Sequence, residues 1–247
     1  MDLTGSEKME TALRLQKVSK IFNQDQWNEV VAVNNISAKF RWGECVLVIG
    51  DNGSGKSTLL NLIDGSVALT KGRVYADGID ISSWPSYKRS SIIYRMHQST
   101  LDGVAPYGTV AENMALSKLE RTNRKGLFSR LVNKEDRKRY KALLEKLKPE
   151  LSDKLDHKAY LLSPGQRQTL GLAMLMLRDD RRRILLADEP TAALDPETSK
   201  ISLDLIYRKA KENWLCFIIT HDTDIIRNHQ GRVLRIGQGE IISDEIV

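Results

Sequence analysis

The segment Gly50-Asp51-Asn52-Gly53-Ser54-Gly55-Lys56-Ser57-Thr58 has the spacing G-x-x-x-x-G-K-S and follows an apolar run, Cys45 to Ile49, that predicts a buried strand. Glycines at this spacing let successive backbone N–H groups turn inward and hold phosphate oxygens. Lys56 then supplies a cation for the β- and γ-phosphates, and the Ser57 hydroxyl is a suitable ligand for Mg²⁺. The following run, Thr58 to Ile63, predicts a helix whose positive end faces the same anion. The stretch therefore predicts a phosphate-binding loop between a strand and a helix.

A second apolar run, Arg183 to Asp188, predicts another strand that ends in two adjacent carboxylates, Asp188 and Glu189. Asp188 is placed to hold the Mg²⁺ shell, and Glu189 to polarise a water in line with the γ-phosphate. Adjacent acids at a strand end could instead form a solvated helix cap. An uninterrupted apolar strand favours the ligand site, because such strands belong to parallel sheets whose carboxyl ends face a ligand crevice.

The segment Leu162-Ser163-Pro164-Gly165-Gln166 precedes a helical pattern that extends to Leu177. It resembles the signature motif of ATP-binding cassette (ABC) proteins, L-S-G-G-Q, and lies upstream of the second carboxylate strand as in that family. Gln98 resembles the family's Q-loop glutamine, Ala193-Leu194-Asp195 the D-loop, and His221 the switch histidine. The resemblance covers nearly the whole chain, from about residue 12 to residue 242.

The resemblance implies an ATPase that uses ATP and Mg²⁺. It assigns nucleotide contacts to Phe22, to the loop residues Gly50, Asp51, Asn52, Gly53, Ser54, Gly55, Lys56, Ser57 and Thr58, and to Ser163, Gly165, Gln166 and Asp195. It assigns metal binding to Ser57, Gln98 and Asp188, and catalysis to Glu189, His221 and Gln98. Phe22 falls where the family has an aromatic residue that stacks on adenine, but Trp27 in the next polar loop is a competing platform.

Pro164 departs from the family pattern, which usually has glycine at this position. If Ser163 is the helix N-cap, Pro164 occupies the first helical position, where its fixed φ fits and its missing N–H has no intrahelical partner. We therefore expect the helix to form. One backbone donor to phosphate is lost, whereas the Ser163 hydroxyl and the Gly165 N–H remain.

The chain has 247 residues, a mass of 28.0 kDa and 41% hydrophobic content, which is enough for one large α/β domain with its own core. Cys45 and Cys216 lie in apolar strands, which predicts buried, reduced thiols of a cytosolic protein. Residues 1–11 lack the apolar stretch of a signal peptide. No apolar run approaches the roughly 20 residues that cross a bilayer, so we do not expect the chain to form a pore by itself.

The order of predicted elements indicates an α/β fold with a mostly parallel sheet and an antiparallel β portion at the start of the chain. The resemblance implies that this is a P-loop NTPase core with an N-terminal antiparallel β subdomain and an inserted helical subdomain. Residues 1–247 form a single ABC ATPase domain in this interpretation. Residues 1–91 and 163–247 make the core and β subdomain, and residues 92–162 the helical subdomain. The antiparallel strands are predicted at Leu13–Phe22, Val30–Phe40 and Gly72–Gly78, and the clearest inserted helices at Val110–Leu119 and Lys134–Leu147.

Residues 118–148, the basic segment, carry twelve Lys and Arg against four Asp and Glu, whereas the whole chain has a net charge of only +6. Such a run is either a solvated helix face or a surface attracted to an anionic membrane leaflet. No nucleic acid partner is expected, because the segment offers only Phe128 and Tyr140 for stacking and shows no nucleic-acid motif.

The family resemblance implies a head-to-tail dimer, in which each ATP lies between one copy's phosphate loop and the other copy's signature motif. It also implies a separate integral membrane permease that docks near Gln98, and a peripheral location on the cytoplasmic face of the inner membrane. A soluble ABC ATPase of DNA repair or translation is the other class, but it commonly has two cassettes or a long coiled coil. Residues 98–106 and 109–113 are similar to bacterial importer ATPases that serve amino-acid-like substrates with a separate substrate-binding protein. The sequence fixes neither the substrate nor the direction of transport.

Overall fold

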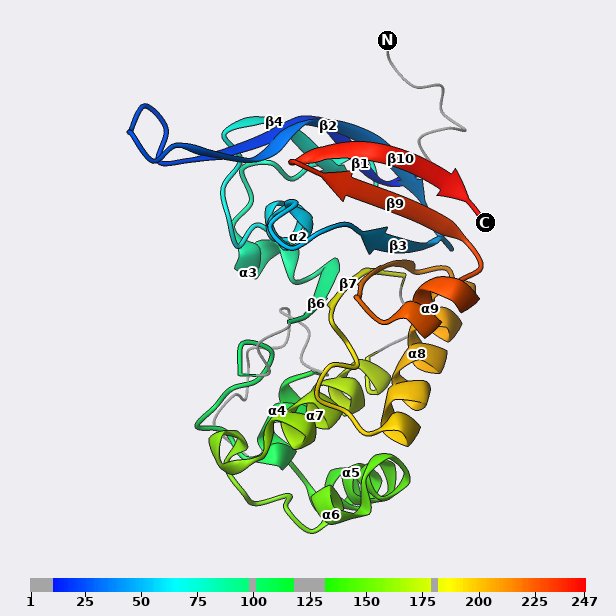
Figure 1. Ribbon diagram of the computed structural model, residues 1–247. Coiled ribbons are helices and arrows are strands. Elements are labelled where there is room, and N and C mark those ends of the chain that lie inside the picture. Colours follow the sequence, from blue (N-terminus) through cyan, green and yellow to red (C-terminus); the bar gives the residue numbers. More distant parts are fainter. Residues whose placement is uncertain (1–10, 98–100, 118–131, 179–181) are drawn as a thin grey trace. The chain divides into compact units, whose positions relative to one another are not determined.

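The computed structural model describes residues 11–97, 101–117, 132–178 and 182–247 (Figure 1). The chain divides into two compact units. The sheet unit comprises Met1–Arg95, Arg182–Glu189 and Tyr207–Val247, and the helical unit comprises Met96–Arg181 and Pro190–Ile206. This grouping places residues 163–178 with the helices, whereas the sequence pattern assigned them to the core.

The sheet unit contains two sheets (Figure 1). The four-stranded sheet is antiparallel and has the order β2 (Val30–Arg41), β1 (Thr11–Phe22), β4 (Lys71–Ala76), β5 (Ile79–Asp80). The six-stranded sheet has the order β10 (Glu240–Ile246), β9 (Arg232–Gly237), β3 (Cys45–Ile49), β8 (Leu215–Ile219), β7 (Ile184–Asp188), β6 (Ile93–Met96). Strands β9, β3, β8 and β7 pair in parallel, and β10 is antiparallel to β9. These sheets confirm the predicted α/β class with its antiparallel β subdomain.

Strand β6 corrects one prediction, because the helical pattern was expected to begin at residue 92. The apolar run Ile93 to Met96 is only four residues long and mostly buried, and it forms a short strand at the end of the six-stranded sheet. The backbone N–H of Ile184 at the start of β7 donates to the carbonyl of Ile92 at 2.9 Å.

Helix α2 (Lys56–Asp64) lies between the two sheets of its unit (Figure 1). Its apolar side chains are fully buried in a core shared with strands of both sheets: Leu59, Leu60, Leu62 and Ile63. The helix begins after Gly55 (φ 102°) and ends at Gly65 (φ 78°), both in the left-handed region that favours glycine. Arg89, at the end of α3 (Ser86–Arg89), donates to the Leu62 and Ile63 carbonyls at 2.7 and 2.8 Å. It therefore satisfies two of the carbonyls that a helix end leaves unpaired.

The helical unit contains α4 (Val110–Leu116), α5 (Lys134–Leu147), α6 (Pro149–Ser152), the 3₁₀ turn η1 (Ala159–Leu161), α7 (Pro164–Met176) and the first part of α8 (Pro196–Lys211). Helix α9 (Thr223–Asn228) and the end of α8 belong to the sheet unit. Capping boxes start α4, α5 and α7. Both inserted helices were predicted correctly, although α4 ends at Leu116 rather than Leu119. No helix among the described residues is long and apolar enough to span a membrane.

The two cysteines face each other across neighbouring strands, since Cys45 on β3 is in register with Cys216 on β8. Both thiols are free and buried, as predicted. Burial raises the pKa of Cys45 to about 12, so its thiolate is scarcely populated near neutral pH.

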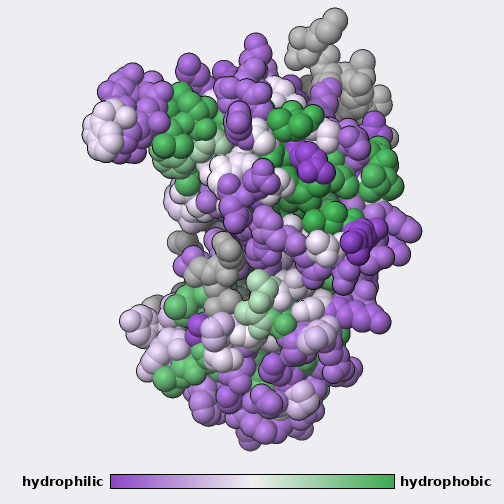
Figure 2. Space-filling model, in the orientation of Figure 1, coloured by the Kyte–Doolittle hydropathy of each residue, from purple (hydrophilic) through white to green (hydrophobic). Residues whose placement is uncertain are grey.

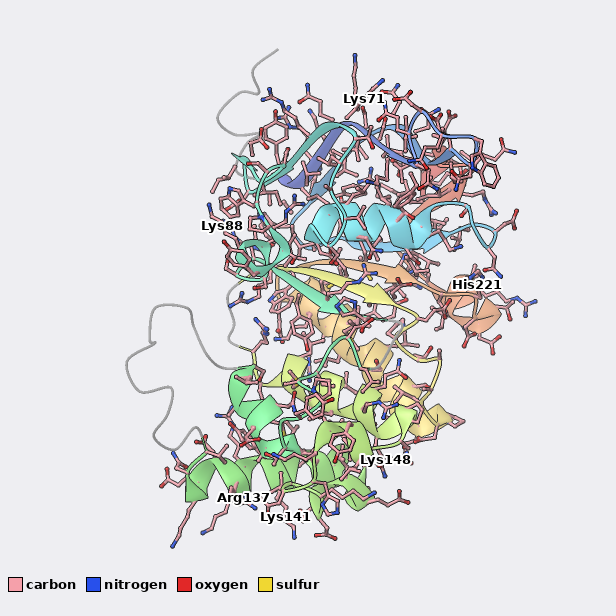
Figure 3. The ribbon with its side chains drawn as sticks, turned by 90° about the vertical axis from the view of Figure 1, so that its left-hand side faces the viewer. Lys71, Lys88, Arg137, Lys141, Lys148 and His221 are labelled. Atoms are coloured by element: carbon pink, nitrogen blue, oxygen red, sulfur yellow. The ribbon has the colours of Figure 1, made fainter. Side chains whose placement is uncertain are left out.

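The described part of the basic segment, residues 132–148, is partly neutralised by acids that follow it in the chain (Figure 3). Arg137 on α5 donates to both carboxylate oxygens of Asp156 at 2.9 and 2.6 Å, and Lys141 donates to Asp153 at 3.0 Å. A charge count confined to residues 118–148 misses these acids. The rest of the basic segment, residues 118–131, lies outside the described residues, so the predictions made for it stay predictions.

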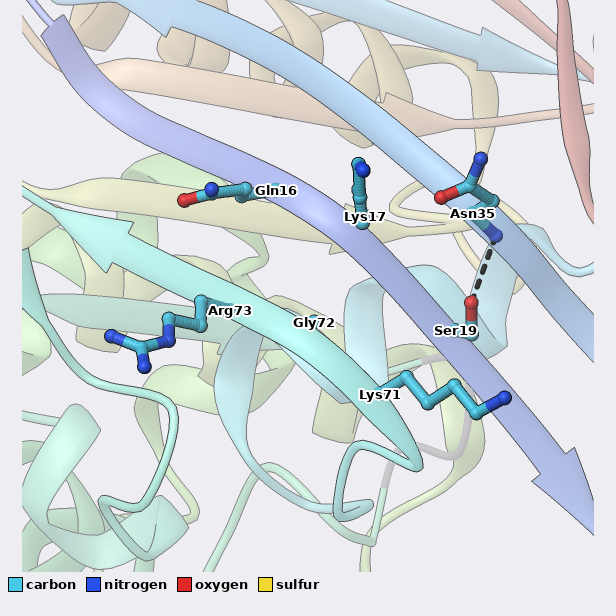
Figure 4. A pocket seen from close by; sticks show the side chains of 7 residues that line it. All are labelled: Gln16, Lys17, Ser19, Asn35, Lys71, Gly72 and Arg73. Atoms are coloured by element: carbon cyan, nitrogen blue, oxygen red, sulfur yellow. Dashed lines mark hydrogen bonds between the residues drawn. The ribbon is translucent and has the colours of Figure 1, made fainter. Parts of the chain in front are cut away.

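A basic pocket of about 390 Å³ opens on the four-stranded sheet (Figure 4). Its lining residues are Gln16, Lys17, Ser19, Asn35, Lys71, Gly72 and Arg73. It forms where β1 shifts register against β4 between Gln16 and Ser19, and where Lys17 has a φ of 49°. Because Lys17 and Lys71 are exposed and Arg73 pairs with Asp80, the pocket is an open surface feature of the bulge.

Candidate functional site

The phosphate loop has backbone geometry that only glycine supports at its two ends. Gly50 and Gly55 have φ of 150° and 102°, and a Cβ atom on them would lie 2.0 Å from the Ile236 carbonyl oxygen and 2.3 Å from the Ala32 carbonyl oxygen. Gly53, between them, has φ 78° with nothing within 4 Å. The neighbouring backbone therefore fixes the ends of the loop, while its centre stays open to a ligand.

Lys56 is held over this loop by the loop's own carbonyl groups. Its buried Nζ donates to the Gly50 oxygen at 2.7 Å and to the Asp51 oxygen at 2.8 Å. An ammonium has three donors, so one remains for a phosphate oxygen. Burial lowers the pKa of Lys56, an effect that the nearby acids Glu189, Asp188 and Asp51 oppose. The arrangement orients a cation before any ligand arrives.

The remaining donors of the loop fit an anion. Helix α2 has Gly55 as its N-cap without a side-chain cap, so its first N–H groups receive no side-chain acceptor. The Ser54 hydroxyl is buried and has no hydrogen-bond partner among the described residues. The Ser57 hydroxyl belongs to an exposed residue on the first turn of the helix. Together these groups suit a polyphosphate at a helix N-terminus.

Asp188 ends β7 with a side chain only 5% exposed, and its Oδ2 accepts a hydrogen bond from Nη2 of Arg95 at 2.7 Å. Arg95 on β6 was not predicted as part of the site. The sequence feature that could have indicated Arg95 is that it is the single charged residue within the apolar run Ile92 to Met96. The described residues contain no group of three or more His, Cys, Asp or Glu side chains that could hold a metal ion by themselves. Mg²⁺ would therefore need phosphate and water oxygens beside Ser57 and Asp188, which is how it commonly binds in nucleotide sites.

Glu189 and His221 follow the neighbouring parallel strands β7 and β8, and Oε1 of Glu189 lies 3.7 Å from Nε2 of His221. The glutamate side chain is 16% exposed and the histidine side chain 53% exposed, at the edge of its unit (Figure 3). Burial raises the pKa of Glu189, an effect that His221 partly opposes and Asp188 reinforces. A partly buried carboxylate with a raised pKa is suited to accept a proton from water.

The backbone of Glu189 is in the left-handed region, with φ 52°, although its N–H still donates to the Ile219 carbonyl at 2.9 Å. A non-glycine residue in this region costs about 1–3 kcal/mol, and such residues concentrate at functional sites. The pairing with β8 holds the glutamate in this conformation at the end of the strand.

The two candidate adenine platforms both lie at the β1–β2 hairpin. Phe22 ends β1 and is 37% exposed, with the Lys20 ammonium 4.9 Å from its ring centroid, whereas Trp27 in the connecting loop is 97% exposed. Figure 2 shows hydrophobic side chains beside this hairpin, where Val30 and Val31 are also exposed. The strand fixes the position of Phe22, and both rings stay accessible to a base.

The signature segment caps helix α7 in the helical unit. The Ser163 hydroxyl accepts from the Gln166 N–H at 3.3 Å, and Gln166 Oε1 accepts from the Ser163 N–H at 3.2 Å. Pro164 takes the first helical position, as predicted, so its missing N–H costs the helix no hydrogen bond. Ser163 and Pro164 are exposed at this helix end.

The D-loop packs directly on the signature helix. A Cβ atom on Gly165 would lie 2.5 Å from the Ala193 carbonyl oxygen, and the Ala193 N–H donates to Gln168 Oε1 at 3.0 Å. Gln168 was not predicted as part of the site. The feature that could have indicated it is a glutamine on the second turn of an otherwise apolar helix face, where the side chain is buried. The signature helix and the D-loop thus form one structural element.

Asp195 uses its carboxylate inside the helical unit. Oδ1 accepts from the Thr198 N–H at 2.9 Å, and Oδ2 accepts from the Lys148 ammonium at 3.0 Å. The Thr198 N–H is the first cause that holds the pKa of Asp195 well below its usual range, followed by Lys148. This carboxylate caps the start of α8 and fixes the D-loop.

The structure gathers the predicted residues in two groups. The sheet unit holds Phe22, the phosphate loop, Asp188, Glu189 and His221. The helical unit holds Ser163, Gly165, Gln166 and Asp195. Gln98, predicted for metal binding and catalysis, lies outside the described residues.

The chain is similar to known proteins over most of its length. The family model described as ABC transporter matches residues 33–192. A tyrosine transport ATP-binding protein of Clostridioides difficile is 34% identical over 235 residues, covering 94% of this chain and 91% of that protein. A phosphonates import ATP-binding protein of Oceanobacillus iheyensis is 30% identical over 239 residues, covering 95% of this chain and 90% of that protein. The structure of the dimeric ATP-binding cassette MJ0796 bound to ADP and Pi is similar, with a TM-score of 0.76 and 26% identity over 95% of this chain and 98% of the other.

Proposed function

The chain belongs to the ABC transporter family and is an ATP-binding ATPase, and from this premise we propose that it powers a bacterial transporter whose membrane permease is a separate protein. The observation that carries the proposal is the sheet unit's combination of a pre-oriented Lys56, an acid pair at the end of β7 and a histidine at the end of β8. All three follow parallel strands at the same edge of one sheet.

For the nucleotide, we assign the phosphates to the loop N–H groups, to Lys56 and to the N-terminus of α2. The adenine ring is assigned to Phe22, with Trp27 as the alternative. Mg²⁺, when bound, neutralises charge on the β- and γ-phosphate oxygens. Its protein ligands in this proposal are the hydroxyl of Ser57 and the carboxylate of Asp188, with Gln98 as a further ligand.

For hydrolysis, Glu189 is the group that orients and deprotonates the attacking water. Its partial burial and its distance of 3.7 Å from His221 support that role. His221 steadies the γ-phosphate and the water. As the water oxygen bonds to the γ-phosphorus, the bond from that phosphorus to the β–γ bridging oxygen breaks and ADP leaves with its electron pair. The proton of the water goes to the Glu189 carboxylate, and Lys56 offsets the negative charge on the phosphate oxygens.

For assembly, two copies form a head-to-tail dimer, in which Ser163 and Gly165 of one copy complete the phosphate site of the other. The exposed N-terminus of α7 supports this role, because its uncovered end attracts an anion. The similar cassette MJ0796 is dimeric. In this proposal the domain consists of the core and β subdomain, about residues 1–91 and 163–247, and the helical subdomain of residues 92–162.

For the partner, the helical unit offers an exposed aromatic surface that suits an amphipathic helix of the permease. Tyr107 and Tyr160 are 82% and 49% exposed with ring centroids 5.8 Å apart, and Leu161 beside them is 61% exposed. Docking of a permease there places the chain on the cytoplasmic face of the inner membrane as a peripheral subunit. An amino-acid-like substrate, delivered by a separate binding protein, agrees with the name of the tyrosine transport relative.

The partner is tested by affinity purification of the tagged chain from detergent-solubilised membranes. We expect one integral membrane protein in a fixed ratio to the chain, and its loss from a variant with Tyr160→Arg and Leu161→Asp. Basal ATP binding of that variant serves as the control for folding. Recovery of ribosomes or DNA-repair proteins in place of a membrane protein would favour the soluble class of ABC ATPases.

A further inference from the structure

A charged cluster is buried beside the proposed metal site, inside the sheet unit. Arg95 on β6 and Asp64 on α2 have side chains 8% exposed, and the Asp188 side chain is 5% exposed. Burial of charged groups carries a desolvation cost that apolar side chains at the same positions would avoid. The desolvation cost of burying Arg95 is not fully offset, because its Nε and Nη1 have no hydrogen-bond partner among the described residues. Stability alone therefore does not account for an arginine at this position.

The guanidinium of Arg95 connects two elements that carry proposed metal ligands. Its Nη2 donates to Asp188 Oδ2 on β7 at 2.7 Å and to Asn61 Oδ1 on α2 at 3.3 Å. Its Nε lies 3.8 Å from Asp64 Oδ2, also on α2, which is an ion pair without a hydrogen bond. One planar side chain thus spans the distance from the strand to the helix.

Ser57 lies on the same face of that helix, because residues 57, 61 and 64 follow the i, i+4, i+7 spacing. Arg95 therefore ties Asp188 to the helix stripe that begins with Ser57. Asp188 uses Oδ2 in this contact, and its Oδ1 accepts no hydrogen bond from Arg95, so Oδ1 is the oxygen that would face the metal. The pattern is that of a residue that orients a metal ligand through its second oxygen.

We propose that Arg95 is a positioning residue for Mg²⁺, which holds the Asp188 carboxylate against helix α2 and so fixes its separation from Ser57. The proposal rests on the metal roles given to Ser57 and Asp188 under the proposed function. It requires arginine rather than lysine, since a compact ammonium cannot bridge Asp188, Asn61 and Asp64 as a planar guanidinium does.

The test measures how strongly Mg²⁺ tightens nucleotide binding. The dissociation constant of a fluorescent, non-hydrolysable ATP analogue is determined with EDTA and with saturating Mg²⁺. The constant in EDTA divided by the constant in Mg²⁺ reports the coupling between metal and nucleotide. The main variant combines Arg95→Met with Asp64→Asn, which keeps the formal charge of the cluster unchanged. We expect its ratio to fall about 10- to 100-fold, the usual effect of losing a group that orients a metal ligand. Binding in EDTA should match the wild type.

Two further variants separate positioning from folding and from charge. Arg89→Met removes another buried arginine of the same unit, which donates hydrogen bonds to the carbonyl groups of Trp84, Leu62, Ile63 and Ser82. It should lower the melting temperature and leave the ratio intact. Arg95→Lys keeps the charge and should still lower the ratio, and it replaces the double variant if that variant does not fold.

Three results would overturn the proposal. A folded double variant with the wild-type ratio would show that Asp188 needs no such support. A larger ratio would show that Arg95 competes with the metal. Full retention by Arg95→Lys would show that charge suffices without the bridge. If the wild type itself binds the analogue equally in EDTA and Mg²⁺, the metal assignment of the proposed function fails, and this inference fails with it. If Mg²⁺ tightens binding to the wild type and to the variants equally, only this inference fails.

Discussion

Substitution of Gly165 by alanine should separate close packing from helix propensity, because α7 contains a matched control, Gly171. A Cβ atom on Gly165 would lie 2.5 Å from the backbone oxygen of Ala193, whereas a Cβ atom on Gly171 would meet nothing within 4 Å. Gly171→Ala should therefore gain about 0.5–1 kcal/mol from helix propensity. At about 2–4 °C per kcal/mol for a chain of this size, its melting temperature should rise by roughly 1–4 °C.

Gly165→Ala should change stability in the opposite direction. The Ala193 carbonyl must move by nearly 1 Å to reach an ordinary contact, and overpacking of this kind costs about 1–3 kcal/mol. The melting temperature should fall by roughly 2–12 °C, and ATPase activity should fall with it, because the displaced D-loop also carries Asp195. Thermal unfolding followed by circular dichroism, with activity measured well below the transition, gives both values. Equal shifts of the same sign in the two variants would refute the direct contact between the signature helix and the D-loop.

The other predictions concern the chemistry, the dimer and the basic segment. Glu189→Gln should retain ATP binding and lose about 10²- to 10⁴-fold in turnover; comparable hydrolysis by both proteins would remove Glu189 from the role of base. Because burial raises the pKa of Glu189 and only the ionised form accepts a proton, activity should be lost on acidification at a higher pH than for an exposed glutamate, whose pKa is about 4.3. His221→Ala removes the charge that opposes this shift, so the acid limb of its pH–rate profile should move to still higher pH. With Mg-ATP, Glu189→Gln should sediment as a dimer and the added change Ser163→Arg should abolish the dimer; a monomer at high concentration would contradict the sandwich. Seven basic residues should be replaced with glutamine: Arg121, Arg124, Lys125, Arg130, Arg137, Lys138 and Arg139. The replacement should weaken salt-sensitive flotation with anionic liposomes, by about 1 kcal/mol for each charge near the surface, whereas equal recovery with neutral liposomes would indicate a solvated face.

The local parts of the site were predictable because each depends on residues close together in sequence. The loop from Gly50 to Thr58 needs glycine at Gly50 and Gly55, because neighbouring backbone leaves no room there for a Cβ atom. Both glycines can be recognised in the sequence by their spacing. The same holds for Pro164, since the first helical position after an N-cap serine suits the φ of proline and loses no intrahelical hydrogen bond. Asp188, Glu189 and His221 could be selected as candidates because each lies at the end of an apolar run, which is a local feature of the sequence.

What could not be predicted depends on tertiary pairing. Arg95 and Asp188 are 93 residues apart, and nothing in the run around Arg95 tells which acid it faces until β6 is placed beside β7. Gln168 meets the Ala193 N–H only because the D-loop folds back on α7. In both cases a polar residue interrupts an apolar face and then binds a functional segment rather than solvent. A lone polar residue in a buried strand or helix face of a nucleotide-binding protein is therefore a reason to look for the functional group it orients, even though the sequence does not say which group that is.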